Sequence, residues 1–252
     1  MNDEHNDKKK LNGHTDNVTP FPSKKERQDI IKQKLKSAKQ AKPASEPIVN
    51  IPPATKMLCL ILLTIHVVLY TLLPLKYLVM AYAKLSFMPY IYTEPFNHLL
   101  MIFTAPITHG FLHGGWMHIL INLAMLIAFG SGVERLIGAR AFWMFFILSV
   151  IGGAAVHLIF FWGTVNPMIG ASGGISGLFG VLMRLLQDRG QMPPGWRGLA
   201  PVCLIWVGIS VLFALFGSVP GENAEIAWSA HVGGFATGLF AYPLVFRWLN
   251  KS

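Results

Sequence analysis

The chain has 252 residues, of which 53% are apolar and only 13% are charged, and its mean hydropathy is +0.47. This composition lies outside the range of soluble globular proteins and predicts a protein embedded in a lipid bilayer. The net charge of +9 is unevenly distributed, since 12 of the 21 Lys and Arg residues precede Met57. We therefore expect the lipid bilayer as a partner of the chain, and no nucleic acid.

Residues 1–56 form a polar, Lys-rich tail that is edged with proline. This composition predicts a basic, largely disordered segment with at most one helix, at about Ser23–Lys39. The favoured role of the tail is to hold the amino terminus in the cytoplasm, and binding to anionic lipid is the alternative. Asp3, Glu4 and Asp7 precede any apolar run, which argues against a cleavable signal peptide.

Residues 57–252 are predicted to form one all-α membrane domain. Six apolar segments in this part have about the length that crosses a bilayer, and they predict a bundle of six transmembrane helices. The fourth segment is short and glycine-rich, which indicates a helix that begins below the membrane surface. The six segments are Met57–Tyr77, Met117–Ile137, Ala141–Trp162, Ser172–Gln187, Leu199–Gly217 and Ala227–Leu249.

Two connections between these segments are distinctive. The stretch from Lys84 to Trp116 is long, aromatic and nearly uncharged. We expect it to lie in the membrane interface, either as a functional loop or as an aromatic belt that anchors the bundle. The stretch from Gly217 to Ile226 is predicted to be a mobile cap, with substrate access past the fifth segment beside it.

Basic residues gather on one side of the predicted bundle. Five arginines lie in or beside the loops after the second and fourth segments, and both ends of the chain are basic as well. Because Lys and Arg are enriched in cytoplasmic loops, both termini are predicted to be cytoplasmic. The short loops and the Lys-rich tail are more typical of a bacterial inner-membrane protein than of an organelle protein.

The fourth segment opens with the sequence GASGGISG from Gly170 to Gly177, which sets Ser172 and Ser176 one helical turn apart. Small residues often serve helix packing in membranes, and the alternative is a nucleophile held at membrane depth. Polar residues elsewhere favour the nucleophile, because intramembrane ionisable groups usually mark functional sites. His118 and Asn122 share a face of the second segment, and His231 opens the sixth.

The predicted topology places the starts of the second, fourth and sixth segments on the same outer side, so His118, Ser172 and His231 share one depth. Small residues at helical spacing line the fourth and sixth segments. Two such stripes allow close backbone approach, so we expect Ser172 and His231 to come within hydrogen-bonding reach. The small residues are Gly173, Ser176, Gly177 and Gly180 on the fourth segment, and Gly234 and Gly238 on the sixth.

These residues resemble the rhomboid family of intramembrane serine proteases. The resemblance covers about Met57–Leu249 and leaves the tail out. The Trp-Arg pair that many members carry in the first outer loop does not occur in Glu94–Thr108. The matching motifs are HGGWMHILIN from His113 to Asn122, GASG around Ser172, AHVGGFATG around His231 and GVERLIG around Glu134.

The resemblance implies a protease that cleaves transmembrane protein substrates in or beside their membrane-spanning segments, with no cofactor and no metal. It implies that Ser172 is the nucleophile, that His231 is the general base and that Ser176 is a packing residue. It also implies that His118 and Asn122 line the oxyanion site, and their side chains have the N–H donors that this role needs. The oligomeric state stays open.

Two other classes remain alternatives: a non-catalytic rhomboid-like protein that binds and routes membrane helices, and a transporter. The presence of both Ser172 and His231 counts against the first, and the sequence shows no internal repeat that would favour the second. His109 and His113 have the spacing of zinc ligands on a helix, but the neighbouring Gly and Pro argue against a helix there. His66 and His157 are expected to bond neighbouring helices.

Overall fold

The computed structural model describes residues 23–40, 50–216 and 227–249. Every regular element within these ranges is a helix, so the all-α expectation is confirmed for this part of the chain. The predicted cap at Gly217–Ile226 and most of the tail lie outside the described residues. The predicted division into residues 1–56 and 57–252 stays a prediction.

Residue contacts divide the chain into two units, Met1–Asn50 and Ile51–Ser252. The first unit contains helix α1, Lys24–Gln40, which confirms the helix expected there. A reciprocal cap begins it: the backbone N–H of Ser23 donates to the Glu26 carboxylate at 2.6 Å, and the N–H of Glu26 donates to the Ser23 hydroxyl at 3.4 Å. These hydrogen bonds hold the pKa of the Glu26 carboxyl below its usual value.

The second unit begins with α2, Pro53–Val67, which continues through a π-helical turn to Leu72. The predicted end of this helix at Tyr77 is wrong. Leu73 is extended because the ring of Pro74 disfavours helical geometry in the residue before it. The helix begins at Pro53, before the predicted start at Met57, because proline is well suited to the first position of a helix.

Most of the connection that follows is helical. Helix α3 spans Leu75–Leu85 and α4 spans Leu99–Thr108, and the Thr108 hydroxyl joins them by donating to the Leu85 carbonyl at 2.7 Å. Large apolar side chains of this connection are exposed, including Phe96. Its location in the membrane interface stays a prediction. Short 3-10 turns occupy Pro89–Tyr92, Pro95–Asn97 and His109–Phe111.

Helix α5, Trp116–Met125, passes through a π-helical turn into α6, Ser131–Phe160. A continuous helix of these 45 residues would be about 68 Å long, roughly twice the thickness of a bilayer's hydrocarbon core. The helix breaks at Gly138, where φ is 83° and ψ is 167°. Only glycine adopts this geometry without strain, so the break falls where sequence analysis ended the second helix and began the third.

The remaining helices are α7, Ser172–Asp188, α8, Trp196–Phe216, and α9, Trp228–Leu249. Their predicted bounds agree to within three residues. Among the described helices, Pro53–Leu72 and Trp116–Phe160 are long and apolar enough to cross a membrane. The full count of six transmembrane helices stays a prediction.

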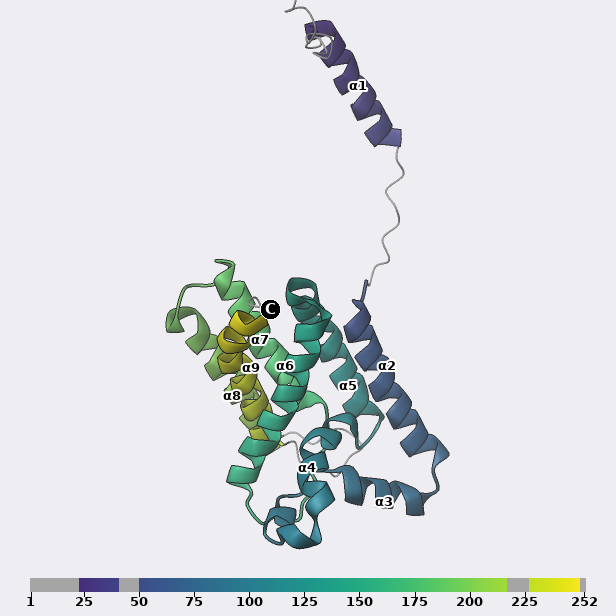
Figure 1. The fold of residues 1–252 in the computed structure, drawn as a ribbon, viewed down its shortest axis with the longest axis vertical. Coiled ribbons are helices and arrows are strands. Elements are labelled where there is room, and N and C mark those ends of the chain that lie inside the picture. The colour runs from purple at the N-terminus through teal and green to yellow at the C-terminus, as the bar shows by residue number, and fades with distance from the viewer. Residues whose placement is uncertain (1–22, 41–49, 217–226, 250–252) are drawn as a thin grey trace, which may run out of the picture. The chain divides into compact units, whose positions relative to one another are not determined.

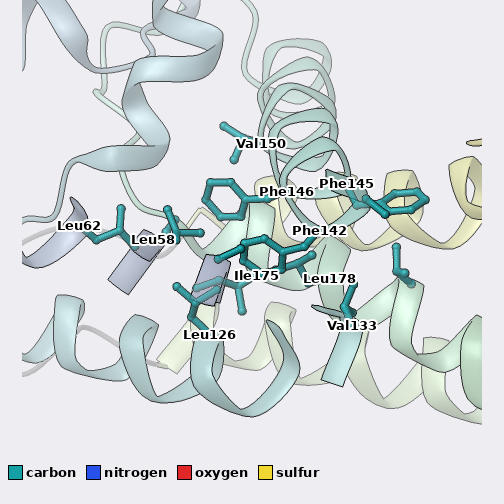
Figure 2. Close-up of a cluster of buried hydrophobic side chains, with 14 of the residues drawn as sticks. Leu58, Leu62, Leu126, Val133, Phe142, Phe145, Phe146, Val150, Ile175 and Leu178 are labelled. Carbon is teal, nitrogen blue, oxygen red and sulfur yellow. The ribbon is translucent and has the colours of Figure 1, made fainter. Parts of the chain in front are cut away.

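Helices α6, α7 and α9 pack against one another, and α8 lies mainly against α9 (Figure 1). A large buried cluster fills the space between α2, the α5–α6 segment and α7 (Figure 2). It contains three fully buried phenylalanines of α6 together with Ile175 and Leu178 of α7. The phenylalanines are Phe142, Phe145 and Phe146.

Glycines bring the backbones of α7 and α9 into direct contact, as the small-residue stripes predicted. A Cβ atom placed on Gly234 would lie 2.0 Å from the carbonyl oxygen of Gly173, and one on Gly238 would lie 2.0 Å from that of Gly177. Any larger residue would separate these two helices. Further along the two helices, Arg184 Nε of α7 donates to the backbone carbonyl of Leu239 in the middle of α9 at 3.1 Å.

Candidate active site

Ser172 and His231 meet at the amino-terminal ends of two helices. Ser172 is the first residue of α7, and His231 lies in the first turn of α9. The Nε2 atom of His231 lies 2.8 Å from the Oγ atom of Ser172, and both side chains are partly exposed. A serine hydroxyl becomes an effective nucleophile when a neighbouring base accepts its proton, so this pair has the geometry that nucleophilic catalysis needs.

The turn before Ser172 is held by backbone hydrogen bonds to the connection between α2 and α5. Phe87 and Met168 bond each other in both directions, with N···O distances of 3.0 and 2.8 Å. The N–H of Gly170 donates to the carbonyl of His109 at 2.9 Å. These bonds fix the position of the α7 amino terminus, where unpaired N–H groups and the helix dipole favour negative charge.

His118 and Gly170 lie beside the serine. A Cβ atom on Gly170 would stand 2.8 Å from Nε2 of His118 and 3.7 Å from Oγ of Ser172, so a single point borders both side chains. Gly170 itself has φ of 123°, which side chains disfavour. This glycine is the first residue of the GASG motif, but the motif alone did not predict a role for it.

Asn122 is buried on the same face of α5 as His118, as their spacing predicted. Its Nδ2 atom donates to the backbone carbonyl of His118 at 2.9 Å. An amide group carries two N–H donors, so this bond orients the side chain and uses one of them. The expected role of Asn122 at the oxyanion stays a prediction.

Ser176 lies one turn further along α7 and is almost completely buried. It belongs to the face of α7 that carries the closely packed glycines. The hydrogen bond of His231 goes to Ser172. The geometry therefore favours Ser172 over Ser176 as the nucleophile, while the catalytic assignment itself stays a prediction.

Four further histidines of the described chain are buried: His66, His109, His113 and His157. His157 Nδ1 lies 2.8 Å from the Ser229 hydroxyl of α9, and the ring of His66 packs against Trp116 of α5. The bond from His157 to a neighbouring helix is confirmed, whereas His66 contacts one by ring packing and its expected bond stays a prediction. The helical turn of His109 ends at Phe111, so the zinc-ligand spacing with His113 does not lie on one helix. Within the described chain, no three His, Cys, Asp or Glu side chains are placed to hold a metal ion.

Glu134 of α6 is buried and caps the start of α2. Its carboxylate accepts hydrogen bonds from the backbone N–H of Ala54 at 2.8 Å and from the N–H and hydroxyl of Thr55 at 2.6 and 2.8 Å. A carboxylate at a helix amino terminus satisfies orphan donors and complements the helix dipole. In the sequence Glu134 stands out only as part of a motif, and the structure gives it this structural role.

Comparison with known proteins agrees with these motifs. The family model of the Rhomboid domain matches residues 102–248, which is more than half of the chain. The chain is 34% identical over 137 residues to the rhomboid protease GlpG of Klebsiella pneumoniae, a match that covers 52% of this chain and 45% of that protein. It is 29% identical over 148 residues to RHOMBOID-like protein 4 of Arabidopsis thaliana, covering 56% of this chain and 34% of that protein.

A third relative is the rhomboid protease GluP of Bacillus subtilis, with 28% identity over 130 residues, which cover 52% of this chain and 24% of GluP. The matched part therefore spans less than half the length of each of these three relatives. Because both bacterial and plant proteins match, the expected bacterial inner membrane stays a prediction.

Proposed function

The chain belongs to the rhomboid family, a family of multi-pass membrane proteins, and on that premise we propose that it is an intramembrane serine protease with a Ser172–His231 catalytic pair. Two bacterial relatives are named as rhomboid proteases. The observation that carries the proposal is the 2.8 Å contact between Oγ of Ser172 and Nε2 of His231.

The proposed reaction proceeds in two steps. Oγ of Ser172 attacks the carbonyl carbon of the scissile peptide while Nε2 of His231 accepts the hydroxyl proton. His231 then gives this proton to the leaving amine, and an acyl-enzyme forms on Ser172. Water attacks the acyl group, again with His231 as the base, and the carboxylic product leaves with Ser172 restored.

The negative charge that develops on the carbonyl oxygen needs donors nearby. We assign this role to the backbone N–H of Ser172, the amide of Asn122 and the imidazole of His118. The point beside Gly170 that borders both His118 and Ser172 supports this assignment. Donors placed in advance near a developing oxyanion are among the largest contributions to catalysis in serine proteases.

The proposed substrates are transmembrane segments of other proteins. The backbone carbonyls of a regular transmembrane helix are tied in internal hydrogen bonds, so a nucleophile reaches one only where the helix unwinds. Preferred substrates are therefore expected to carry Gly, Pro or other helix-weakening residues near the cut. The proposed topology has six spans with both termini cytoplasmic, which places the site in the outer half of the membrane.

A cleavage assay tests this proposal. The full-length protein in liposomes is incubated with a panel of single-span membrane proteins, each also made with its helix-weakening residues replaced by Leu. We expect cleavage that Ser172→Ala and His231→Ala abolish, that Ser176→Ala largely keeps, and that the Leu replacements slow strongly. If Ser172→Ala cleaves as well as the unaltered protein, the proposed nucleophile is wrong.

The competing function is a non-catalytic member of the family that binds membrane helices. It predicts that substrates are bound and not cut. Recovery of intact substrate with the unaltered protein across the panel, together with stable binding, would favour this function over the proposed protease.

A further inference from the structure

Helix α1 combines an apolar stripe with flanking lysines. Its 17 residues contain seven Lys or Arg residues and two acidic residues. The sequence places apolar residues at Ile31, Leu35 and Ala38, at spacings of four and three that share one helical face. Ile31 is 57% exposed. An apolar stripe in a strongly basic helix is the pattern of helices that lie in a membrane interface.

Three of the lysines form a row to one side of this stripe. Lys25, Lys32 and Lys36 recur at spacings of seven and four, and all three are exposed on one side of α1. At 3.6 residues per turn, this row lies about 100 to 140° around the helix from Ile31. Lysines at this position reach headgroup phosphates while the apolar stripe enters the membrane.

The two acidic residues of α1 lie on the side of the helix opposite Ile31. Asp29 lies two positions before Ile31, which places it about 160° away around the helix axis, next to the lysine row and about 20° from Lys36. Glu26 is engaged in the cap with Ser23 at the start of α1. The acidic side is therefore directed away from a surface that contacts Ile31.

The chain also keeps α1 near a membrane. Twelve residues, Ala41–Pro52, separate its end from α2, the first apolar helix. Twelve residues reach at most about 40 Å when fully extended. A helix held this close meets the membrane surface at a high effective concentration, so weak individual contacts suffice.

We propose that α1 lies along the membrane surface and binds anionic phospholipid headgroups through Lys25, Lys32 and Lys36, with the Ile31 stripe in the headgroup region. The apolar stripe and the row of lysines specify a lipid surface rather than any acidic polymer. This inference is independent of the proposed protease activity.

A fluorescent label that reports polarity tests the inference in the full-length protein. The two cysteines of the chain, Cys59 and Cys203, are replaced by Ala, and a single label is attached at Ile31→Cys or, as a matched control on the opposite side, at Asp29→Cys. The protein is placed in nanodiscs of phosphatidylcholine alone or with phosphatidylglycerol. We expect a blue shift and quenching by a lipid-attached quencher only for the Ile31 label, and only with phosphatidylglycerol.

Replacement of Lys25, Lys32 and Lys36 by Gln should lower the ratio of bound to free helix by on the order of a hundredfold, and high salt should weaken binding as well. The control removes the same charge elsewhere in the tail, at Lys8, Lys9 and Lys10. An equal loss of membrane binding in this control variant, or the same fluorescence signal in phosphatidylcholine alone, would overturn the inference. A signal that follows protein concentration instead of lipid composition would also overturn it, because it would indicate contact with a second copy.

Discussion

Nε2 of His231 lies 2.8 Å from Oγ of Ser172, although 59 positions separate the two residues in the chain. Both belong to the first turns of helices that run in the same direction and touch along their backbones. The backbone contacts at Gly234 and Gly238 set the distance between these helices. The pairing of serine and histidine thus depends on glycines that lie deeper in the bundle.

Replacement of Gly238 by Ala should therefore impair the site from a distance. The added Cβ would stand 2.0 Å from the carbonyl oxygen of Gly177, so α9 must move away from α7. Overpacking of this kind costs about 1–3 kcal/mol of stability, and a displacement of about 1 Å at a catalytic pair lowers the rate about a hundredfold. Thermal unfolding in detergent and cleavage rates measure the two effects.

Gly208→Ala on α8 is the matched control, because a Cβ there meets no atom within 4 Å. Alanine is the better helix former, so this variant should be as stable as the unaltered protein or slightly more stable. If Gly238→Ala behaves like Gly208→Ala in both measurements, the backbone contact does not set the geometry of the site.

Gly170→Ala should remove activity while the bundle stays folded. Its methyl group would lie 2.8 Å from Nε2 of His118 and fill the space proposed for the oxyanion. Gly138→Ala is the control, since Gly138 also has positive φ but a Cβ there meets nothing within 4 Å. Alanine at positive φ brings backbone strain of about 1–3 kcal/mol in both variants. Equal activity of the two variants would therefore contradict the proposal that the oxyanion occupies the space beside Gly170.

Asn122→Ala should lower kcat far more than it raises KM, because the proposed bond to the oxyanion forms chiefly in the transition state. Loss of one such donor costs about 10²–10³ in rate in other serine proteases. Steady-state kinetics on one substrate checks this, with the exposed Asn97→Ala as control. An unchanged kcat with a raised KM would make Asn122 a substrate-binding residue instead.

Glu134→Gln should destabilise the bundle without a direct effect on chemistry. The amide presents an N–H group where the carboxylate accepts bonds from Ala54 and Thr55, and a buried donor left unsatisfied costs about 1–3 kcal/mol. The melting temperature in detergent should fall, whereas Glu94→Gln, at an exposed position, should leave it unchanged. Equal melting temperatures of the two variants would show that the α2 cap contributes little.

The bundle helices were predictable because their apolar segments are long and their breaks are marked by particular residues. Gly138 ends one helix, and the glycines of α7 and α9 mark the face at which they touch. The end of α2 was misjudged because Tyr77 continues the apolar run, while Pro74 interrupts the backbone. Hydropathy does not register this interruption.

The candidate site was predictable only in part. Ser172 and His231 follow from motifs and from a shared depth, and their spacing in the structure agrees with that expectation. The turn that holds Ser172 rests on backbone bonds from Phe87 and His109, which depend on long-range packing and leave no local pattern. The capping role of Glu134 was hidden for the same reason, since its partners lie about 80 positions earlier.

The catalytic role of Ser172 and His231 is tested most directly by covalent capture of the nucleophile with a fluorophosphonate, mapped by mass spectrometry on the full-length protein in detergent. We expect one adduct, on Ser172, that forms much more slowly in His231→Ala and is unaffected by Ser176→Ala. An adduct on Ser176, or labelling of Ser172 at the same rate without His231, would contradict this role.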